Sequence, residues 1–419
     1  MEELLNFFIE IGKLKRMPRR GWVINQIKNP ESIAEHSFRA ALMTWILGEE
    51  KGGLNIEKLL KMILIHDVCE VYAGDTTPYD LILLKNKKKL RELMKTWPRF
   101  PTPIKKEVVL KKHQKEAKAL EKLISKLPPN LKKEIKNLWL DYEKGLTSEG
   151  RFLRQADRME NFLQAYEYWK KYKNPPLGPW WLWAREFFDD PLLVEFMLAL
   201  EKKFHYQKIP KKLKPSLILL DFFSEVGKLK RKPRRGWMVH QIKNPESTAD
   251  HIFRMATLAW ILGKKKQLNL ERVIKMALVH DLCEIYTMDL TPYDPLLPKN
   301  KKKIMEVLKR WPQFTPALKR KKMKEKSKAE SIAIDKLISK LPSDLKVEIK
   351  NLWRDFEKGL TKEGRFVHQI DKIENFLQGL EYWKKYGKIQ HKLWRRWIKE
   401  WIDDPILIKF IKAIEKKFY

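Results

Sequence analysis

Cysteine is nearly absent from this chain of 419 residues. The two cysteines, Cys69 and Cys283, occupy equivalent places in two similar halves, and neither belongs to a CxxC pair. A disulfide would have to join two helices of separate domains. We therefore interpret both cysteines as small buried residues without a redox role.

Long uncharged apolar runs are also missing. No stretch approaches the roughly 18 residues that a membrane span requires. The N-terminal residues Met1-Glu2-Glu3 lack the basic region of a signal peptide. These absences predict a soluble, cytoplasmic protein that has no membrane partner. With 43% hydrophobic residues, the chain is long enough for two domains of about 200 residues each.

Acidic residues are too few to balance the basic ones. Lys and Arg total 88 against 53 Asp and Glu, which gives a net charge of +35. Such an excess attracts polyanions, whether nucleic acid, nucleotide phosphates or acidic membrane surfaces. The lysines are spread over almost every expected helix surface, however, and a high lysine content is also typical of proteins from hot environments. Charge alone therefore assigns no function.

The chain is a tandem repeat. Residues 16–39 match residues 231–254 at an offset of 215, with 17 of 24 positions identical, and the offset falls to 214 farther along. A segment with two prolines and four lysines separates the copies. We assign repeat one to residues 1–206, the linker to 207–215 and repeat two to 216–419.

Each repeat is expected to be helical throughout. Apolar residues recur at helical spacing, and no strand-period segment of useful length appears. Ser32 and Glu35 form a capping-box pattern, and Gly145 marks a helix end. The sequence thus predicts an all-α fold of two helical bundles. In repeat one the expected helices cover residues 4–14, 33–47, 56 to about 70, 87–96, 105–126, 131–144 and 149–172, with an irregular arm over 18–30.

Tryptophans gather near the end of each repeat. Their spacing fits an amphipathic helix, which favours a place in the core or at a seam between the repeats over a platform for stacked bases. The residues are Trp180, Trp181 and Trp183, and then Trp394, Trp397 and Trp401.

A histidine and two carboxylates end an apolar run in both repeats. In repeat one they are His66, Asp67 and Glu70, and in repeat two they are His280, Asp281 and Glu284. If the preceding helix continues through them, the three side chains share one face. A single adjacent His and Asp also occurs by chance at a solvated helix end, so the pair needs further partners.

Further candidates lie elsewhere in the repeat. His36 sits one turn into its helix, and Asp157 lies on a mostly buried helix, where an unpaired carboxylate would be costly. Asp75 follows in a turn. Two histidines and two aspartates from separate helices suit a divalent ion such as Mn, Co or Fe(II) better than Zn or Mg, with one ion in each repeat. The equivalents in repeat two are His251, Asp371 and Asp289.

With these residues the sequence resembles the HD-domain metal phosphohydrolase superfamily, whose pattern is His, then His-Asp, then Asp. Three further features resemble its 5'-deoxynucleotidase branch, which includes the YfbR-type enzymes. They are residues 15–22 ahead of Pro30-Glu31-Ser32, the turn Gly74-Asp75, and residues 149–152 before the last Asp. The resemblance covers nearly all of each repeat.

The resemblance implies roles for individual residues. The metal ligands would be His36, His66, Asp67 and Asp157, and likewise His251, His280, Asp281 and Asp371. The acid/base or orienting carboxylates would be Glu70, Asp75, Glu284 and Asp289. Arg20, Trp22, Arg235 and Trp237 would bind the phosphate and pack near the sugar. Here the chain departs from the bacterial pattern, because Gly21 and Gly236 separate Arg from Trp; repeat two also has Met288 in place of Gly74 and Asp250 in place of Glu35.

Structural alternatives stand beside these roles. Arg20 can be a surface arginine, and Trp22 can be part of the core. Glu70 can pair with Arg39, and Asp75 can serve only to form its turn.

The first hypothesis is therefore a metal-dependent hydrolase that releases phosphate from (deoxy)nucleoside 5'-monophosphates. Since single-repeat relatives are commonly homodimers, the repeats are expected to pack as a pseudo-twofold pair, which leaves room for further homo-oligomers. An HD-type nuclease acting on single-stranded nucleic acid is the second hypothesis, favoured by the basic charge and the lysine-rich segments 85–89, 105–126 and 299–303. A non-catalytic nucleic-acid-binding scaffold is the third, although the complete ligand sets argue against it.

Overall fold

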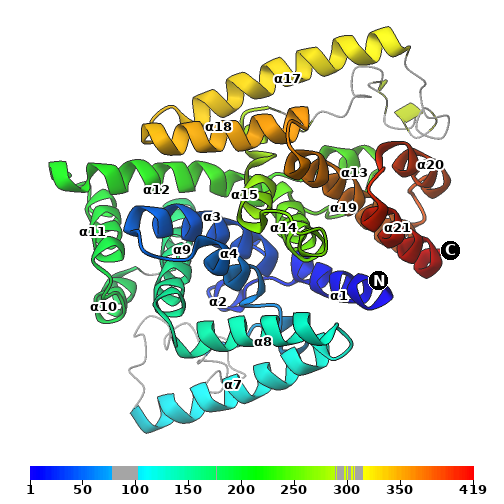
Figure 1. Cartoon of the computed structure of the whole chain (residues 1–419). Helices are drawn as coiled ribbons and strands as arrows, with labels where there is room; N and C mark the ends of the chain where they lie inside the picture. The colour runs from blue at the N-terminus through cyan, green and yellow to red at the C-terminus, as the bar shows by residue number, and fades with distance from the viewer. Residues whose placement is uncertain are drawn as a thin grey trace. The chain divides into compact units, whose positions relative to one another are not determined.

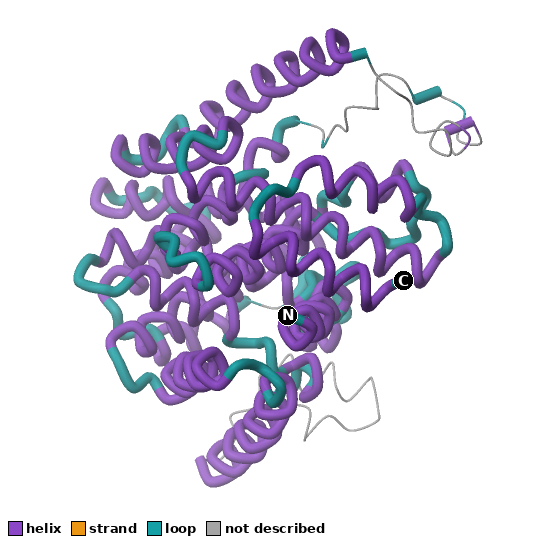
Figure 2. The backbone as a smooth tube through the Cα atoms, turned by 45° about the vertical axis from the view of Figure 1, so that its right-hand side comes forward, coloured by secondary structure: helices purple, strands orange, loops and turns teal. Residues whose placement is uncertain are grey.

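The computed structural model describes residues 1–77, 102–175, 177–287, 289 and 315–419, together with 297, 298, 300, 303, 304 and 306. These residues form helices joined by loops, and none of them forms a strand (Figure 2). The predicted all-α fold is confirmed. Within the described part of the chain, no helix is long and apolar enough to cross a bilayer.

The chain forms two compact units. One comprises Asn6–Ser224, and the other comprises Met1–Leu5 with Glu225–Tyr419. Each unit holds most of one sequence repeat, and the same series of helices recurs in both (Figure 1). The boundaries drawn from the sequence and the pseudo-twofold packing of the repeats stay predictions.

The helices follow one another in the same order in both repeats. The first series is α1 (Glu2–Ile11), η1 (Gly12–Arg16), α2 (Arg20–Ile24), α3 (Ile33–Lys51), α4 (Ile56–Ile65), α5 (Glu70–Ala73), α7 (Thr102–Ile124), α8 (Pro129–Lys144), α9 (Ser148–Tyr172), α10 (Gly178–Phe187) and α11 (Pro191–Phe204). The second is η2 (Lys211–Leu213), α12 (Lys214–Val226), η3 (Gly227–Arg231), α13 (Arg235–Val239), α14 (Thr248–Lys264), α15 (Leu270–Val279), η4 (Leu282–Ile285), α17 (Pro316–Ile338), α18 (Ser343–Lys358), α19 (Lys362–Tyr386), α20 (His391–Trp401) and α21 (Pro405–Phe418).

Helix α3 forms the centre of the first unit. Every residue from 33 to 48 is buried, because α4 and α9 both pack against it. The predicted capping box is confirmed: the Glu35 backbone N–H donates to Ser32 Oγ at 2.9 Å, and the Ser32 N–H donates to the Glu35 carboxylate at 2.7 Å. This box fixes the start of α3 and so the position of His36 on its first turn. Helix α14 is built in the same way in the second unit.

The helix that leads to His66 is shorter than predicted. Helix α4 ends at Ile65 instead of continuing to about residue 70, and α5 begins only at Glu70. His66 Nδ1 lies 2.7 Å from the carbonyl oxygen of Ile63. A side chain that binds a carbonyl oxygen near the end of a helix takes the place of a backbone hydrogen bond of that helix. The prediction that His66 and Glu70 share one face of a continuous helix was therefore wrong.

Two predictions for the N-terminal segment were also wrong in detail. Helix α1 gives way to the 3-10 turn η1 after Ile11, and the arm expected to be irregular contains the short helix α2. Backbone hydrogen bonds from Arg19 to Glu31 and from Ile33 to Met17, both 2.9 Å long, hold the two ends of the arm together. A helix predicted over 87–96 lies outside the described residues.

Helices α8 and α9 pack closely together at Gly150. A Cβ atom added there would lie 2.3 Å from Asp141 Oδ1 and 2.5 Å from the Asp141 carbonyl oxygen. The Asp141 side chain cannot easily withdraw, because it accepts hydrogen bonds from the backbone and hydroxyl of Thr147 at 2.9 and 2.7 Å.

We therefore expect Gly150→Ala to lower the free energy of unfolding by about 1–3 kcal/mol, the usual cost of overpacking. Denaturant titration followed by circular dichroism measures it. Gly178→Ala is the matched control, since a Cβ there meets nothing within 4 Å. Equal stability of the two variants would contradict this account of the α8–α9 contact.

Candidate metal centre

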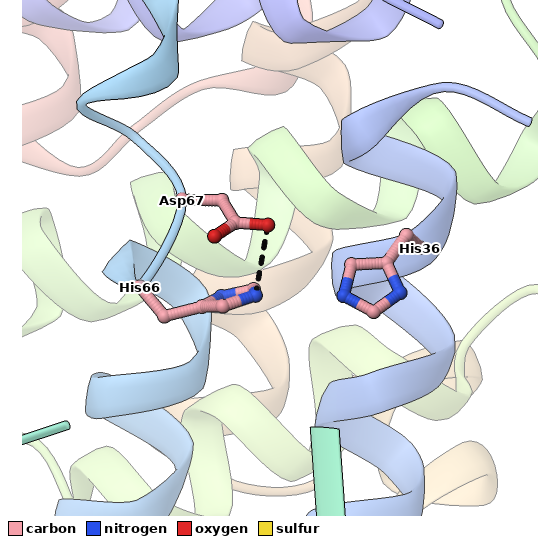
Figure 3. Close-up of side chains that lie close together, drawn as sticks. All are labelled: His36, His66 and Asp67. Atoms are coloured by element: carbon pink, nitrogen blue, oxygen red, sulfur yellow. Dashed lines mark ion pairs between the residues drawn. The ribbon is translucent and has the colours of Figure 1, made fainter. Parts of the chain in front are cut away.

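Three side chains from two separate segments of the sequence converge in each repeat. His36 comes from α3, while His66 and Asp67 come from the turn after α4, and one ligand atom of each lies within 4.8 Å of the others (Figure 3). The rings of His36 and His66 have centroids 5.5 Å apart. His251, His280 and Asp281 form the equivalent group in repeat two.

The fourth predicted ligand joins this group from α9. Asp157 Oδ1 lies 2.9 Å from His36 Nε2 and 3.7 Å from His66 Nε2. In repeat two, Asp371 Oδ1 lies 3.2 Å from His251 Nε2. The structure thus brings each predicted quartet together, although the role of its members as metal ligands stays a prediction.

The donor atoms fit a divalent cation. The Nε2 atoms of His66, His251 and His280 are buried without a hydrogen-bond partner, whereas buried polar atoms in proteins are normally paired. Each of these nitrogens faces carboxylate oxygens, as a cation shared between them would require. A set of two imidazoles and two carboxylates suits a transition metal of intermediate softness.

A buried network holds His36 in place from behind. Glu160 Oε2 lies 2.5 Å from His36 Nδ1, and Glu160 Oε1 accepts a hydrogen bond from Arg39 Nε at 2.7 Å. Arg39 is fully buried and also donates to Glu167 at 2.8 Å and to Gln164 at 2.9 Å. Such outer partners orient metal-ligating histidines. The alternative that pairs Arg39 with Glu70 is wrong.

Sequence reasoning missed this network. Its one signal was the spacing of Glu160, which lies one helical turn after Asp157 on the same helix. Repeat two repeats the arrangement with His251, Glu374, Arg254, Glu381 and Gln378.

Burial and the neighbouring charges shift the pKa values of the candidate ligands. Burial and Arg19 lower the pKa of His36, but Glu160 and Asp157 outweigh both and raise it to about 9. Burial raises the pKa of Asp157, while the hydrogen bond from His36 lowers it to about 2. The Asp157 carboxylate therefore remains ionised and available to a cation.

The arginine whose side chain contacts the candidate ligands is Arg19. The sequence had instead suggested its neighbour, Arg20, as the arginine of the site. Arg19 Nη1 donates to Asp67 Oδ2 at 2.5 Å, Nη2 donates to Asn161 at 3.1 Å, and Nε lies 3.9 Å from Asp75 Oδ2. Arg20 contributes its backbone N–H, which donates to Asp75 Oδ2 at 2.6 Å. In repeat two, Arg234 and Arg235 divide these contacts in the same way.

Trp22 occupies an aromatic cluster. Its side chain is 2% exposed, its indole N–H donates to Glu31 at 2.8 Å, and its ring stacks on Trp180 and meets the edge of Tyr168. Trp237 has the same hydrogen bond to Glu246 and stacks on Trp394. Both belong to the core, while their predicted contact with a sugar stays a prediction.

Glu70 and Asp75 both lie close enough to Arg19 to interact with its charge. The Glu70 side chain is buried and its Oε2 has no hydrogen-bond partner. Burial, together with the charges of Asp67 and Asp75, raises the pKa of Glu70 well above its ordinary value, although Arg19 acts against this. A raised pKa favours the protonated form of Glu70, which is the form that a proton donor needs. The predicted Glu284 and Asp289 occupy the equivalent places around Arg234.

The two cysteines are buried free thiols, as expected from the sequence. Burial raises the pKa of both Cys69 and Cys283 well above the ordinary value. They are therefore present as neutral thiols.

If Glu160 orients His36, then Glu160→Gln should raise the dissociation constant for Mn²⁺ by about ten- to hundredfold. The measurement is calorimetric titration of a chain that carries His280→Ala, so that the repeat-one site alone is compared. Glu167→Gln is the matched control, because Glu167 also binds Arg39 but does not contact His36. Equal losses in the two variants would show that only the Arg39 network matters.

The comparisons with known proteins agree with this geometry. The family model described as HD domain matches residues 11–178 and 226–396. The 5'-deoxynucleotidase HDDC2 of Xenopus laevis is 36% identical over 175 residues, which is 41% of this chain and 74% of that protein. The human protein of the same name is 35% identical over 39% of this chain and 68% of its own length. The 5'-deoxynucleotidase hdd1 of Schizosaccharomyces pombe is 32% identical over 46% and 90%.

The two matched regions correspond to the two sequence repeats and contain both quartets. The resemblance seen in the motifs is thereby confirmed. The chain belongs to the HD domain family, with one copy of the domain in each repeat.

Proposed function

We propose that this chain is a metal-dependent phosphohydrolase that hydrolyses (deoxy)nucleoside 5'-monophosphates to nucleoside and phosphate. The observation that carries the proposal is the pair of quartets, in which buried imidazole nitrogens without a hydrogen-bond partner face carboxylates beside a mostly buried arginine. The substrate class is taken from the names of the relatives, several of which are 5'-deoxynucleotidases. A cytoplasmic location stays a prediction.

A divalent ion held by the quartet would supply Lewis acidity, withdrawing charge from the phosphate oxygens and acidifying a nearby water. His36 and His66 would hold it through Nε2, and Asp67 and Asp157 through their carboxylates. Mn, Co and Fe(II) remain our proposed ions, with one in each repeat.

The remaining residues divide the other tasks. Arg19 presents a guanidinium fork at the site, and such a fork binds two phosphate oxygens at once. Its present partners, Asp67 and Asn161, hold the fork in position. Glu70 is buried and its pKa is raised, which favours a role in giving a proton to the leaving 5'-oxygen. Asp75 fixes the start of α2 through the backbone of Arg20 and thereby positions Arg19.

The test is phosphate release from dAMP, dCMP, dGMP and dUMP and from the ribose forms, with Mn²⁺ or Co²⁺ added. Turnover should require the metal and be abolished by EDTA. The double variant His66→Ala with His280→Ala should lose at least about hundredfold, because each site loses one ligand. No turnover of any nucleotide, or undiminished turnover by the double variant, would refute the proposal.

The same assay separates the roles of the two neighbouring arginines. Arg19→Ala with Arg234→Ala should lower kcat/KM by about hundredfold, because a charge-assisted phosphate contact is lost. Arg20→Ala with Arg235→Ala is the matched pair and should lose much less, since the backbone N–H that binds Asp75 or Asp289 is retained. The reverse order would restore the role that the motif assigns to Arg20.

A further inference from the structure

The two sites share their quartets but differ in the residue that binds the last aspartate from outside. In repeat one, the Tyr142 hydroxyl donates to Asp157 Oδ2 at 3.0 Å. The equivalent residue in α18 is Phe356, which has no hydroxyl and whose ring lies 4.9 Å from that of His280. A neutral hydrogen-bond donor is therefore lost in repeat two.

A cation takes its place. Lys372 Nζ donates to Asp371 Oδ2 at 2.7 Å, and Asn375 donates to Asp371 Oδ1 at 2.8 Å, so that both oxygens of this carboxylate are occupied. The equivalent of Lys372 in repeat one is Arg158, whose Nε is 4.0 Å from Asp157 Oδ2.

The guanidinium group of Arg158 lies against aromatic rings. Its guanidinium carbon lies 5.6 Å from the ring centre of Trp183 and 4.9 Å from that of Phe187. Asn161 and its equivalent Asn375 both bind the backbone oxygen of the aspartate and the side chain of the arginine, but only Asn375 also donates to a carboxylate oxygen of the aspartate. The Asp157 carboxylate is thus less engaged with cations and amides than that of Asp371.

The buried glutamate differs as well. Glu284 accepts a hydrogen bond from the Thr248 hydroxyl at 2.9 Å, and the Lys232 ammonium binds its backbone oxygen. Repeat one has Ile33 and Met17 at these positions, neither of which can donate from its side chain. Repeat two is therefore held by additional polar contacts at two places around its quartet.

From these differences we infer that the two sites are unequal, and that repeat one binds its divalent cation more tightly than repeat two. An ammonium bonded to a ligand carboxylate neutralises its charge and repels an entering cation. The Tyr142 hydroxyl orients Asp157 without adding positive charge. Lys372 is then the residue that sets the affinity of the second site. The inference rests on the proposed metal sites but not on the identity of the substrate.

The experiment compares two single-site chains by calorimetric titration with Mn²⁺ in the absence of substrate. His280→Ala leaves the repeat-one site, and His66→Ala leaves the repeat-two site. The dissociation constant should be about ten- to hundredfold higher for the repeat-two site, which is the range by which outer partners change metal affinity. Circular dichroism verifies that each chain is folded.

Two substitutions then test the cause. Lys372→Met should tighten the repeat-two site by about tenfold, and Tyr142→Phe should weaken the repeat-one site. Lys385→Met, on the same helix and over the ring of Tyr386, is the matched control and should change neither. Equal affinities in the single-site chains, binding at neither site, or no response to Lys372→Met would overturn the inference. A failure to release phosphate with Mn²⁺ bound would instead count against the proposed function.

Discussion

A buried ion network lies behind each proposed metal site, and the geometry of the site depends on it. Arg39 has no access to solvent, and a buried charge without partners would cost several kcal/mol. Glu160, Glu167 and Gln164 satisfy its nitrogens. Because one oxygen of Glu160 is committed to Arg39, the other is directed at His36 Nδ1, and the opposite ring nitrogen must face Asp157. The network thus determines which nitrogen of His36 is available as a ligand.

Charge balance explains why a divalent cation suits the place where the four candidate ligands converge. Asp67 and Asp157 remain ionised, because neighbouring histidines lower the pKa of both despite burial, and Arg19 adds to this effect at Asp67. Two ionised carboxylates with two neutral imidazoles carry two negative charges, which a divalent cation would balance. Arg19 already opposes the charges of Asp67 and Asp75, and it would remain beside the cation to meet an incoming phosphate. At Glu70 the effect has the opposite direction, because burial and the charges of Asp67 and Asp75 raise its pKa.

Much of the fold and all four candidate ligands of each site could be predicted from the sequence. Helical periodicity and caps are local properties, so α3, α8 and α9 were placed to within a few residues, and the repeated motif connected His36 with Asp157 across 121 positions. The choice between Arg19 and Arg20 could not be made, because it depends on where the five-residue helix α2 begins. The end of α4 was misplaced because a histidine side chain, bound to the Ile63 carbonyl, ends the helix. Glu160 was missed because its partners come from another helix.

The residues around one site can change without altering the other site, because each site is built within its own unit. All four candidate ligands of a site, and the arginine and glutamates around them, belong to a single unit. A change beside Asp371 therefore leaves the quartet of repeat one untouched. The positions that differ, Tyr142 and Phe356 or Arg158 and Lys372, contact a ligand carboxylate from outside, where a substitution changes affinity by a moderate factor and does not remove a ligand. A duplicated chain can thus keep two complete quartets while the residues around them make two different sites.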